Sequence, residues 1–192
     1  EAEPLSGIEA FLDWYGIGKE AHRDYWRRVL AADFHFRPRK ATRHFTPGEV
    51  IDLGTCTAEV IHAPGHTPGF TVFYFREPQV LYLGDYDLTA FGPWYGDRDS
   101  SIEDTIASLQ RLRKIPAKVW LTSHEDGCFA GDATEAFDRY LAVIDAREAK
   151  LLEFLSEPRT LDAIVAACLV YRKPREPKAF FEWGEGAIMG KH

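Results

Sequence analysis

The stretch from Val60 to Phe70 places the strongest constraint on how this chain folds. It reads Val-Ile-His-Ala-Pro-Gly-His-Thr-Pro-Gly-Phe, so an apolar run enters a turn in which His66 lies between two Pro-Gly pairs. Proline fixes φ and removes a backbone donor, whereas glycine permits backbone angles that other residues avoid. Such a turn can hold the His66 imidazole in one position at the end of a strand.

Two later apolar runs end in a similar way. Residues 80–84 lead directly into Asp85, and residues 118–123 lead into His124. In layered α/β proteins, ligands gather in crevices outside the ends of strands. Two imidazoles and one carboxylate are suitable ligands for zinc, iron or manganese. The pattern therefore predicts that His66, Asp85 and His124 converge on a metal site.

Composition limits the class of protein. The 192 residues suffice for one substantial domain, with or without a small appendage, and the 45% hydrophobic content is that of a chain with a buried core. The formal net charge of −7 gives no overall basic excess for a nucleic-acid-binding surface. The composition thus disfavours nucleic acid as a partner.

The cysteines and the apolar runs indicate the compartment. Cys56, Cys128 and Cys168 are odd in number, widely spaced and without a CxxC pair, which predicts reduced thiols and a cytoplasmic location. No apolar run approaches the ~20 residues that cross a bilayer, so no membrane partner is expected. The chain starts without Met and ends abruptly at His192, so we expect a piece of a longer polypeptide.

Local patterns predict a mixed α/β architecture. Strand-like runs cover 50–53, 57–61, 70–75, 80–84 and 118–123, and the first two flank a turn typical of a hairpin. Helical spacing covers 6–14, 19–31, 102–112, 132–155 and 161–168. Ser6, either Ser100 or Ser101, and Thr160 are the expected N-caps. Residues 33–48 are expected to be irregular.

The loop from 86 to 100 is rich in aromatic residues and follows Asp85 directly. A long loop beside a site often shapes a substrate pocket. On that interpretation Trp94 and Tyr95 bind substrate. On the alternative interpretation the aromatic residues cover the edge of the core, and the sequence favours neither.

Three motifs resemble the metallo-β-lactamase superfamily. Ala63–Gly69 looks like its third motif, Leu83–Asp85 like its fourth, and Thr122–His124 like its fifth. The resemblance covers about residues 45–128 and implies an α/β fold, as part of an αββα sandwich. The segment Pro158–Asp162 looks like the start of the helical or winged-helix appendage of the lactamase-beta-2-like branch. We therefore expect residues 1–131 to be the second half of the catalytic domain and residues 132–192 to be a truncated helical appendage.

The resemblance also implies roles for the three candidate ligands. His66 would bind a first metal ion, Asp85 would bridge two ions, and His124 would bind the second. Two zinc ions are expected in the intact protein, with iron or manganese as alternatives. The implied activity is hydrolysis of an ester, thioester or similar small substrate by a metal-bound hydroxide. No catalytic side chain beyond these ligands is expected in this chain.

One departure from the family pattern is large. The HxHxDH motif, which carries the other ligands, is absent, so a preceding segment or a partner chain is expected to complete the metal site. The remaining candidates receive minor roles: His62 in the core or supporting a ligand, Asp87 and Glu125 supporting an imidazole or exposed, His35 and His44 at the surface, and Cys128 in packing.

Alternatives to the hydrolase remain open at this level. A nuclease of the same fold fits the winged-helix-like tail but not the net charge. A metal-less remnant would act as a scaffold or interaction module. Persulfide oxygenation with one iron is a further possibility within the family. The glyoxalase II branch is disfavoured, because the loop after Asp85 does not resemble its pattern. The sequence does not identify the substrate.

Overall fold

The computed structural model describes residues 6–125 and 127–192. The strands are β1 (Val50–Asp52), β2 (Thr57–His62), β3 (Thr71–Phe75), β4 (Val80–Gly84), β5 (Val119–Thr122) and β6 (Cys128–Ala130). The helices are α1 (Ile8–Trp14), α2 (Glu20–Arg28), the π-helix η1 (Val29–Asp33), α3 (Ile102–Leu112), α4 (Thr134–Phe154), α5 (Leu161–Ala167) and α6 (Lys178–Met189). The predicted α/β class is confirmed.

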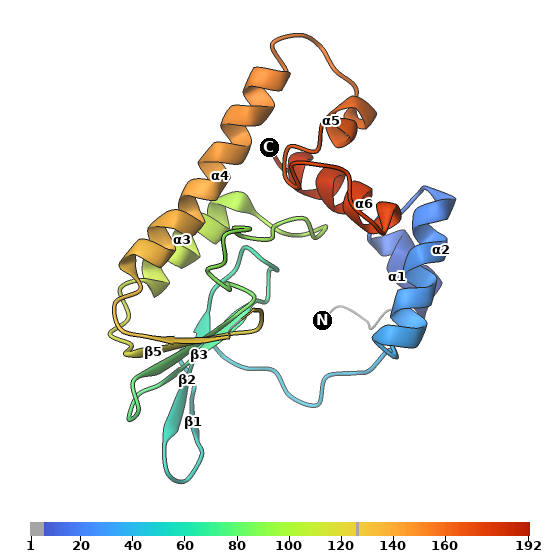
Figure 1. The fold of residues 1–192 in the computed structure, drawn as a ribbon. Helices are drawn as coiled ribbons and strands as arrows, with labels where there is room; N and C mark the ends of the chain where they lie inside the picture. Colours follow the sequence, from blue (N-terminus) through green and yellow to red (C-terminus); the bar gives the residue numbers. More distant parts are fainter. Residues whose placement is uncertain (1–5, 126) are drawn as a thin grey trace.

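All six strands form one sheet in the order β1-β2-β3-β4-β5-β6 (Figure 1). Every neighbouring pair is antiparallel except β4 and β5, which run parallel with Gly84 opposite Thr122. Helix α3 makes the crossover that a parallel pair requires. Because β4 and β5 end at the same edge of the sheet, the residues that follow them lie close together.

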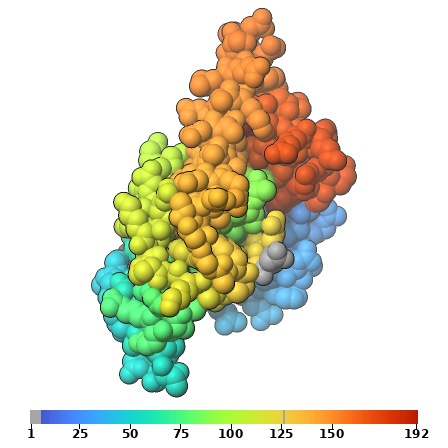
Figure 2. Space-filling view, turned by 60° about the vertical axis from the view of Figure 1, so that its left-hand side comes forward, coloured from blue at the N-terminus to red at the C-terminus, as the bar shows by residue number. Residues whose placement is uncertain are grey.

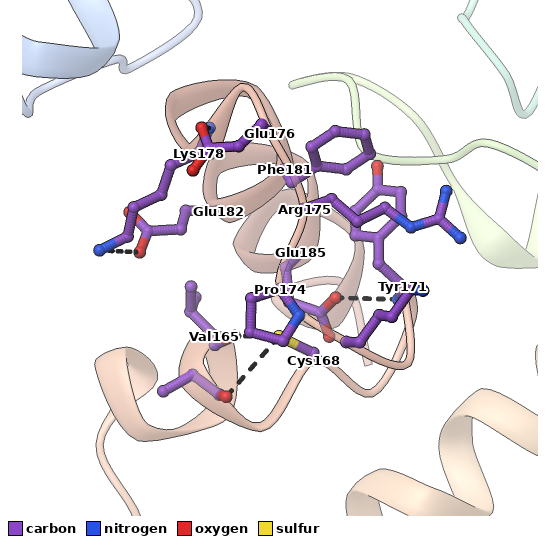
Figure 3. Close-up of a pocket in the computed structure, with 12 residues that line it drawn as sticks. Val165, Cys168, Tyr171, Pro174, Arg175, Glu176, Lys178, Phe181, Glu182 and Glu185 are labelled. Carbon is purple, nitrogen blue, oxygen red and sulfur yellow. Dashed lines mark hydrogen bonds and ion pairs between the residues drawn. The ribbon is translucent and has the colours of Figure 1, made fainter.

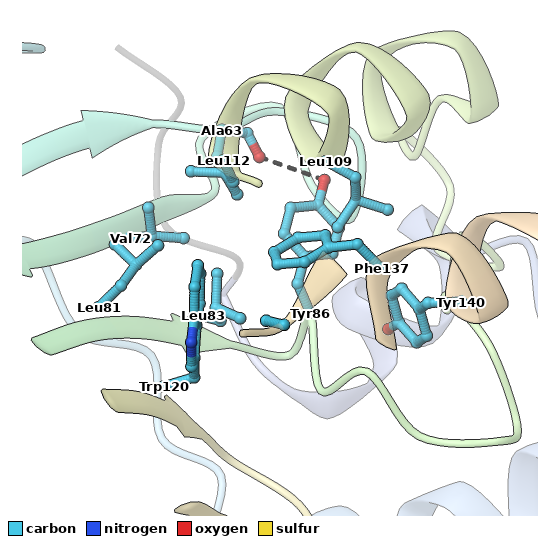
Figure 4. Close-up of a cluster of buried hydrophobic side chains, with 11 residues drawn as sticks. Ala63, Val72, Leu81, Leu83, Tyr86, Leu109, Leu112, Trp120, Phe137 and Tyr140 are labelled. Atoms are coloured by element: carbon cyan, nitrogen blue, oxygen red, sulfur yellow. Dashed lines mark hydrogen bonds between the residues drawn. The ribbon is translucent and has the colours of Figure 1, made fainter. Parts of the chain in front are cut away.

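Helices α3 and α4 cover one face of the sheet (Figure 1). The main core lies between these helices and the sheet (Figure 4). Alternate residues of the strands point into it, as the period of two predicts. The fully or almost fully buried members of this core are Ala63, Val72, Leu81, Leu83, Tyr86, Leu109, Leu112, Trp120, Ala133, Phe137 and Tyr140.

The opposite face of the sheet is also apolar. Phe73, Tyr82 and Leu121 lie opposite one another across β3, β4 and β5, and all three are half-buried. Phe45 packs on Phe73 with 5.6 Å between the ring centroids. Within residues 6–125 and 127–192 there is one sheet, so the second sheet that an αββα sandwich needs does not lie in this described part.

The C-terminal helices pack back on the rest of the chain. Helix α4 leaves the sheet and projects beyond it, and α5 and α6 lie beside it (Figures 1 and 2). Buried Tyr95, Ile144 and Ile188 join this region to the loop before α3. The buried Glu185 carboxylate of α6 accepts a hydrogen bond from the backbone N–H of Tyr171 over 3.2 Å (Figure 3). It also accepts from the backbone N–H of Val170 over 2.9 Å, and the two bonds fix the α5–α6 connection.

The first and last helices are neighbours in space. Leu12, Ile17 and Leu30 form a small core to which Trp183 of α6 contributes. Lys19 forms a 2.8 Å ion pair with Asp162. A division at residue 131 stays a prediction, because these contacts join the two predicted parts without testing the boundary.

The structure also refines the predicted elements. Ser101 and Thr160 cap α3 and α5 as expected, but the N-cap of α1 is Gly7 without a side-chain bond, so the Ser6 cap was wrong. The second helix becomes a π-helix after Arg28. Strand β6 and helix α6 were not predicted. No helix among the described residues is long and apolar enough to span a membrane.

Candidate metal centre

The turn that carries His66 packs directly against the start of α3. Gly65 has φ of +133°, and a Cβ atom there would lie 2.4 Å from the backbone N of Thr105. The backbone N–H of Ser101 donates to the Gly65 carbonyl over 2.9 Å. Only glycine satisfies both the backbone angle and the close approach. The glycine before His66 is therefore explained by packing.

Hydrogen bonds from side chains hold the rest of this turn. The buried Tyr86 hydroxyl donates to the Pro64 carbonyl over 2.9 Å and accepts from the His66 backbone N–H over 3.2 Å. Ser108 donates to the same Pro64 carbonyl, and Ser100 donates to the His66 carbonyl over 2.6 Å. Because these donors lie on different elements, the turn is fixed from several directions.

The His66 ring has a defined orientation. Its Nδ1 atom lies 3.1 Å from the backbone carbonyl oxygen of Trp94, and a carbonyl can only accept, so Nδ1 carries the proton. The Nε2 atom then faces Asp85, with 3.2 Å to Oδ2. Phe70 packs on the ring at 5.1 Å between centroids. Nε2, the ring nitrogen that a metal ion would take, therefore points at the carboxylate.

The Asp85 carboxylate lies between the two imidazoles. Its Oδ2 faces His66, and its Oδ1 lies 3.2 Å from Nε2 of His124. The side chains of His66, Asp85 and His124 are 13%, 38% and 59% exposed, so the site opens toward His124. The structure thus brings together the three side chains that the sequence selected.

The electrostatics of the pair keep the carboxylate anionic. The hydrogen bond from His66 lowers the pKa of Asp85 below its usual value, against the opposing effect of burial. For His66, burial by itself lowers the pKa, but the Asp85 carboxylate and the Trp94 carbonyl outweigh it and raise the pKa overall. Asp85 is therefore ionised at neutral pH, as a carboxylate that binds a metal must be.

The three donors are of a chemical type that binds metal ions, but they are too few to enclose one. Two donors on one tetrahedral zinc at ~2.0–2.1 Å lie about 3.3 Å apart, close to the 3.2 Å separation of each imidazole nitrogen from Asp85. A carboxylate with one oxygen toward each imidazole could bridge two ions. Within the described residues, however, no group of three or more His, Cys, Asp or Glu encloses a metal position.

A pocket of about 540 Å³ adjoins the three residues. Trp94 lines it, and its role in binding substrate stays a prediction. Tyr95 does not line it: its side chain is fully buried in the cluster with Ile144, and its hydroxyl lies 2.9 Å from Nε2 of His192. The two adjacent residues thus differ in place: Trp94 lines the pocket, and Tyr95 lies in the buried cluster. Tyr95 therefore takes a core position.

The minor candidates occupy different positions. His62 is exposed and its Nε2 lies 2.7 Å from the Pro68 carbonyl oxygen, so the core alternative was wrong, while support of a ligand stays a prediction. Asp87 lines the pocket and accepts from the backbone N–H of Thr89 over 3.2 Å. The other minor candidates, all exposed, are His35, His44, Cys128 and Glu125.

Most of the pocket wall was missed by the sequence reasoning. Aromatic side chains of Phe11, Trp26, Phe36 and Trp183 line it, and they come from the two ends of the chain. The available signal was the density of aromatic residues at 11–36 and 180–183. Nothing in a single sequence indicated that these segments meet.

Comparison with known proteins decides the family. The model of the metallo-beta-lactamase superfamily matches residues 5–124, well over half of the chain. The chain belongs to the metallo-beta-lactamase superfamily. The three candidate ligands lie within the matched range.

Curated relatives in this superfamily match part of the chain. A hydroxyacylglutathione hydrolase of Methylococcus capsulatus is 33% identical over 107 residues, which are 55% of this chain and 38% of that protein. An acyl-coenzyme A thioesterase of Gallus gallus is 33% identical over 97 residues, which are 48% of this chain and 32% of that protein. The loop after Asp85 led us to disfavour the glyoxalase II branch, and these matches do not support that prediction. The chain spans less than half the length of either relative.

Solved structures of superfamily members share the fold. A metallo-beta-lactamase family protein from Thermus thermophilus superposes with a TM-score of 0.66 at 24% identity, over 94% of this chain and 61% of that chain. A beta-lactamase domain protein from Burkholderia ambifaria gives 0.64 at 20% identity, over 96% and 56%. Both matches extend across the C-terminal helices, so those helices have counterparts in solved superfamily structures.

Proposed function

We propose that the intact protein is a metal-dependent hydrolase that cleaves an ester or thioester. The observation that carries this proposal is the arrangement around Asp85, whose two carboxylate oxygens each face one imidazole nitrogen at 3.2 Å. Superfamily relatives that are named as hydrolases and as a thioesterase support the reaction class.

The residues of this chain have separate tasks in that reaction. His66 would hold one metal ion, His124 a second, and Asp85 would bridge them. When bound, the ions supply a Lewis acid and lower the pKa of water toward neutrality. The Trp94 carbonyl keeps the His66 ring in the tautomer that presents Nε2. The turn and Tyr86 keep the ring in place before substrate arrives.

Three donors do not complete two metal sites. A catalytic zinc normally has three protein ligands and an open position. We therefore propose that the missing donors come from a segment outside these 192 residues or from a partner chain. The share of each curated relative that the chain covers, 38% and 32%, supports this part of the proposal.

The test uses the full-length protein with its metal. Elemental analysis on protein of measured mass gives the metal content, and hydrolysis of a simple thioester gives kcat/KM. We expect Asp85→Asn to lower metal content and to reduce kcat/KM by more than about 100-fold, since even a supporting partner of a ligand is worth about 10–100-fold. The matched control is Asp138→Asn, an exposed carboxylate paired with Arg113.

Each result has a defined meaning. Full metal content and activity in Asp85→Asn would overturn the assignment of the site. One iron per chain in the wild-type protein would favour oxygenation over hydrolysis. A full-length protein without metal would favour the scaffold alternative.

A further inference from the structure

The pocket beside Asp85 is walled by aromatic side chains from separate parts of the chain. Phe11 comes from α1, Trp26 from α2, Trp94 from the loop after β4, and Trp183 from α6. Figure 1 shows α1 and α2 lying beside α6, which explains how both ends of the sequence contribute to one wall. The wall is therefore part of the tertiary fold and does not belong to a single loop.

The aromatic rings pack on one another. The centroids of Trp26 and Trp183 are 5.0 Å apart, those of Trp94 and Trp183 are 5.6 Å apart, and those of Phe11 and Phe36 are 5.3 Å apart. Tilted and edge contacts at such distances are favourable. A wall whose members restrain each other keeps its shape before a ligand binds, which reduces the entropic cost of binding.

Apart from the three candidate metal ligands, the charged side chains that line the pocket are all acidic. Its acidic lining residues are Asp85, Asp87 and Asp97, and its described lining contains no Lys or Arg. Asp97 accepts a hydrogen bond from Trp94 Nε1 over 2.9 Å, and Asp87 accepts from the backbone of Thr89. An anionic group placed against this wall would meet carboxylates and no cation from the described chain.

We propose that this pocket binds an uncharged, bulky apolar acyl group, such as an arylacetyl group, beside the metal ligands. The volume of about 540 Å³ lies within the range of about 300–1,000 Å³ usual for small-molecule sites. The proposal rests on the hydrolase function for the bond that is cleaved. In that reaction the oxygen of water joins the acyl carbon, the carbon–sulfur bond of a thioester breaks, and the thiol leaves with a proton.

The first experiment varies only the acyl group. The full-length, metal-loaded protein is assayed with N-acetylcysteamine thioesters of phenylacetic, acetic, lactic and succinic acid. We expect kcat/KM for the phenylacetyl thioester to exceed the acetyl and lactoyl values by at least about tenfold, because a single methylene in an apolar pocket is already worth about 10–200-fold. Equal or better use of the lactoyl or succinyl thioester would overturn the proposal.

The second experiment measures binding without turnover. Trp26, Trp94 and Trp183 line the pocket, so occupancy should change tryptophan fluorescence. Phenylacetamide, which is uncharged, should produce half of its change at a concentration at least about tenfold lower than lactamide. No difference between the two amides would contradict an apolar pocket.

A pair of variants tests whether the preference for the phenylacetyl group depends on this wall. Trp183→Leu keeps an apolar side chain but removes the rings, and it should reduce the preference for phenylacetyl over acetyl by at least about fivefold. The control is Phe45→Leu, an exposed aromatic residue that packs on Phe73 away from the pocket. It should leave the preference unchanged. Equal preferences in both variants would overturn the location, and the wild-type comparisons stand even if Trp183→Leu does not fold.

The two proposals fail in different ways. If no thioester is hydrolysed but phenylacetamide binds more tightly than lactamide, the hydrolase function is wrong and the apolar pocket stands. If thioesters are hydrolysed without an apolar preference, the pocket proposal is wrong and the hydrolase function stands.

Discussion

The imidazole Nδ1 of His66 lies 3.1 Å from the backbone carbonyl oxygen of Trp94. One bond thus joins a candidate metal ligand to a residue of the pocket wall. A shift of the loop at Trp94 would move the carbonyl acceptor away from Nδ1, and the His66 ring could then rotate. The orientation of the candidate ligand therefore depends on whatever holds this loop.

Arg147 holds that loop from α4. It is buried, and it donates to the carbonyl oxygens of Phe91 and Pro93 over 2.7 Å each. Arg147→Met should lower the free energy of unfolding by about 2–4 kcal/mol, since a buried and a partly buried carbonyl oxygen lose a charged donor. Urea denaturation measures this. The control Arg139→Met, on an exposed position of the same helix, should change it by less than about 0.5 kcal/mol. Similar losses in both variants would contradict the prediction.

Gly65→Ala should be among the most damaging small substitutions in the turn. The added Cβ would lie 2.4 Å from Thr105, at a φ of +133° that alanine avoids. We expect a loss of about 2–4 kcal/mol, from strain and from separation of the turn and α3. Gly69→Ala, which meets nothing within 4 Å, should be nearly neutral. Thermal unfolding of the two variants compares them directly, and a neutral Gly65→Ala would refute the packing argument.

Tyr86→Phe tests the hydrogen bonds that hold the turn. The hydroxyl is buried and bonds to the backbone of His66 and Pro64, so its removal should cost about 1–3 kcal/mol. Tyr82→Phe removes a hydroxyl that meets Ser123 at an exposed position, and it should cost less than about 1 kcal/mol. Chemical denaturation distinguishes them. A loss for Tyr82→Phe as large as that for Tyr86→Phe would contradict the prediction, whatever the absolute size of the two losses.

The ion pairs of Glu9 should make part of the folding stability depend on pH in the acid range. Hydrogen bonds from Arg27 and then Arg23 lower its pKa from 4.5 to about 2. A carboxyl with a lowered pKa in the folded state stabilises that state above pH 4.5 and loses this contribution as the pH falls toward 2. The melting temperatures of wild type and Glu9→Gln should therefore differ at pH 7 and converge near pH 2. A constant difference across this range would count against the linkage.

Much of the architecture could be predicted because short-range patterns decided it. The β1–β2 hairpin, β3, β4, α3 and its Ser101 cap follow from alternation, helical spacing and cap chemistry. Helix α6 was missed because its sequence, with Gly184 and Gly186 among aromatic residues, has a weak helical signal. Tertiary packing of Trp183 and Ile188 stabilises it instead.

The candidate site could be predicted for the same reason, but only in part. His66, Asp85 and His124 each follow an apolar strand, and strand ends meet at one edge of a sheet. Trp94 and Tyr95 show the limit of this reasoning. A local pattern places both in the loop, whereas the backbone geometry decides that one lines the pocket and the other is buried.

The parallel pairing of β4 with β5 also implies an order of assembly. His66 and Asp85 are joined by consecutive antiparallel strands, whose local contacts form with little loop closure. His124 reaches Asp85 only after the crossover through α3 has closed and β5 has paired with β4. During synthesis, a chain that ends before residue 119 can therefore hold one imidazole–carboxylate pair but not the second. We expect the site to form in two stages, with its more exposed half last.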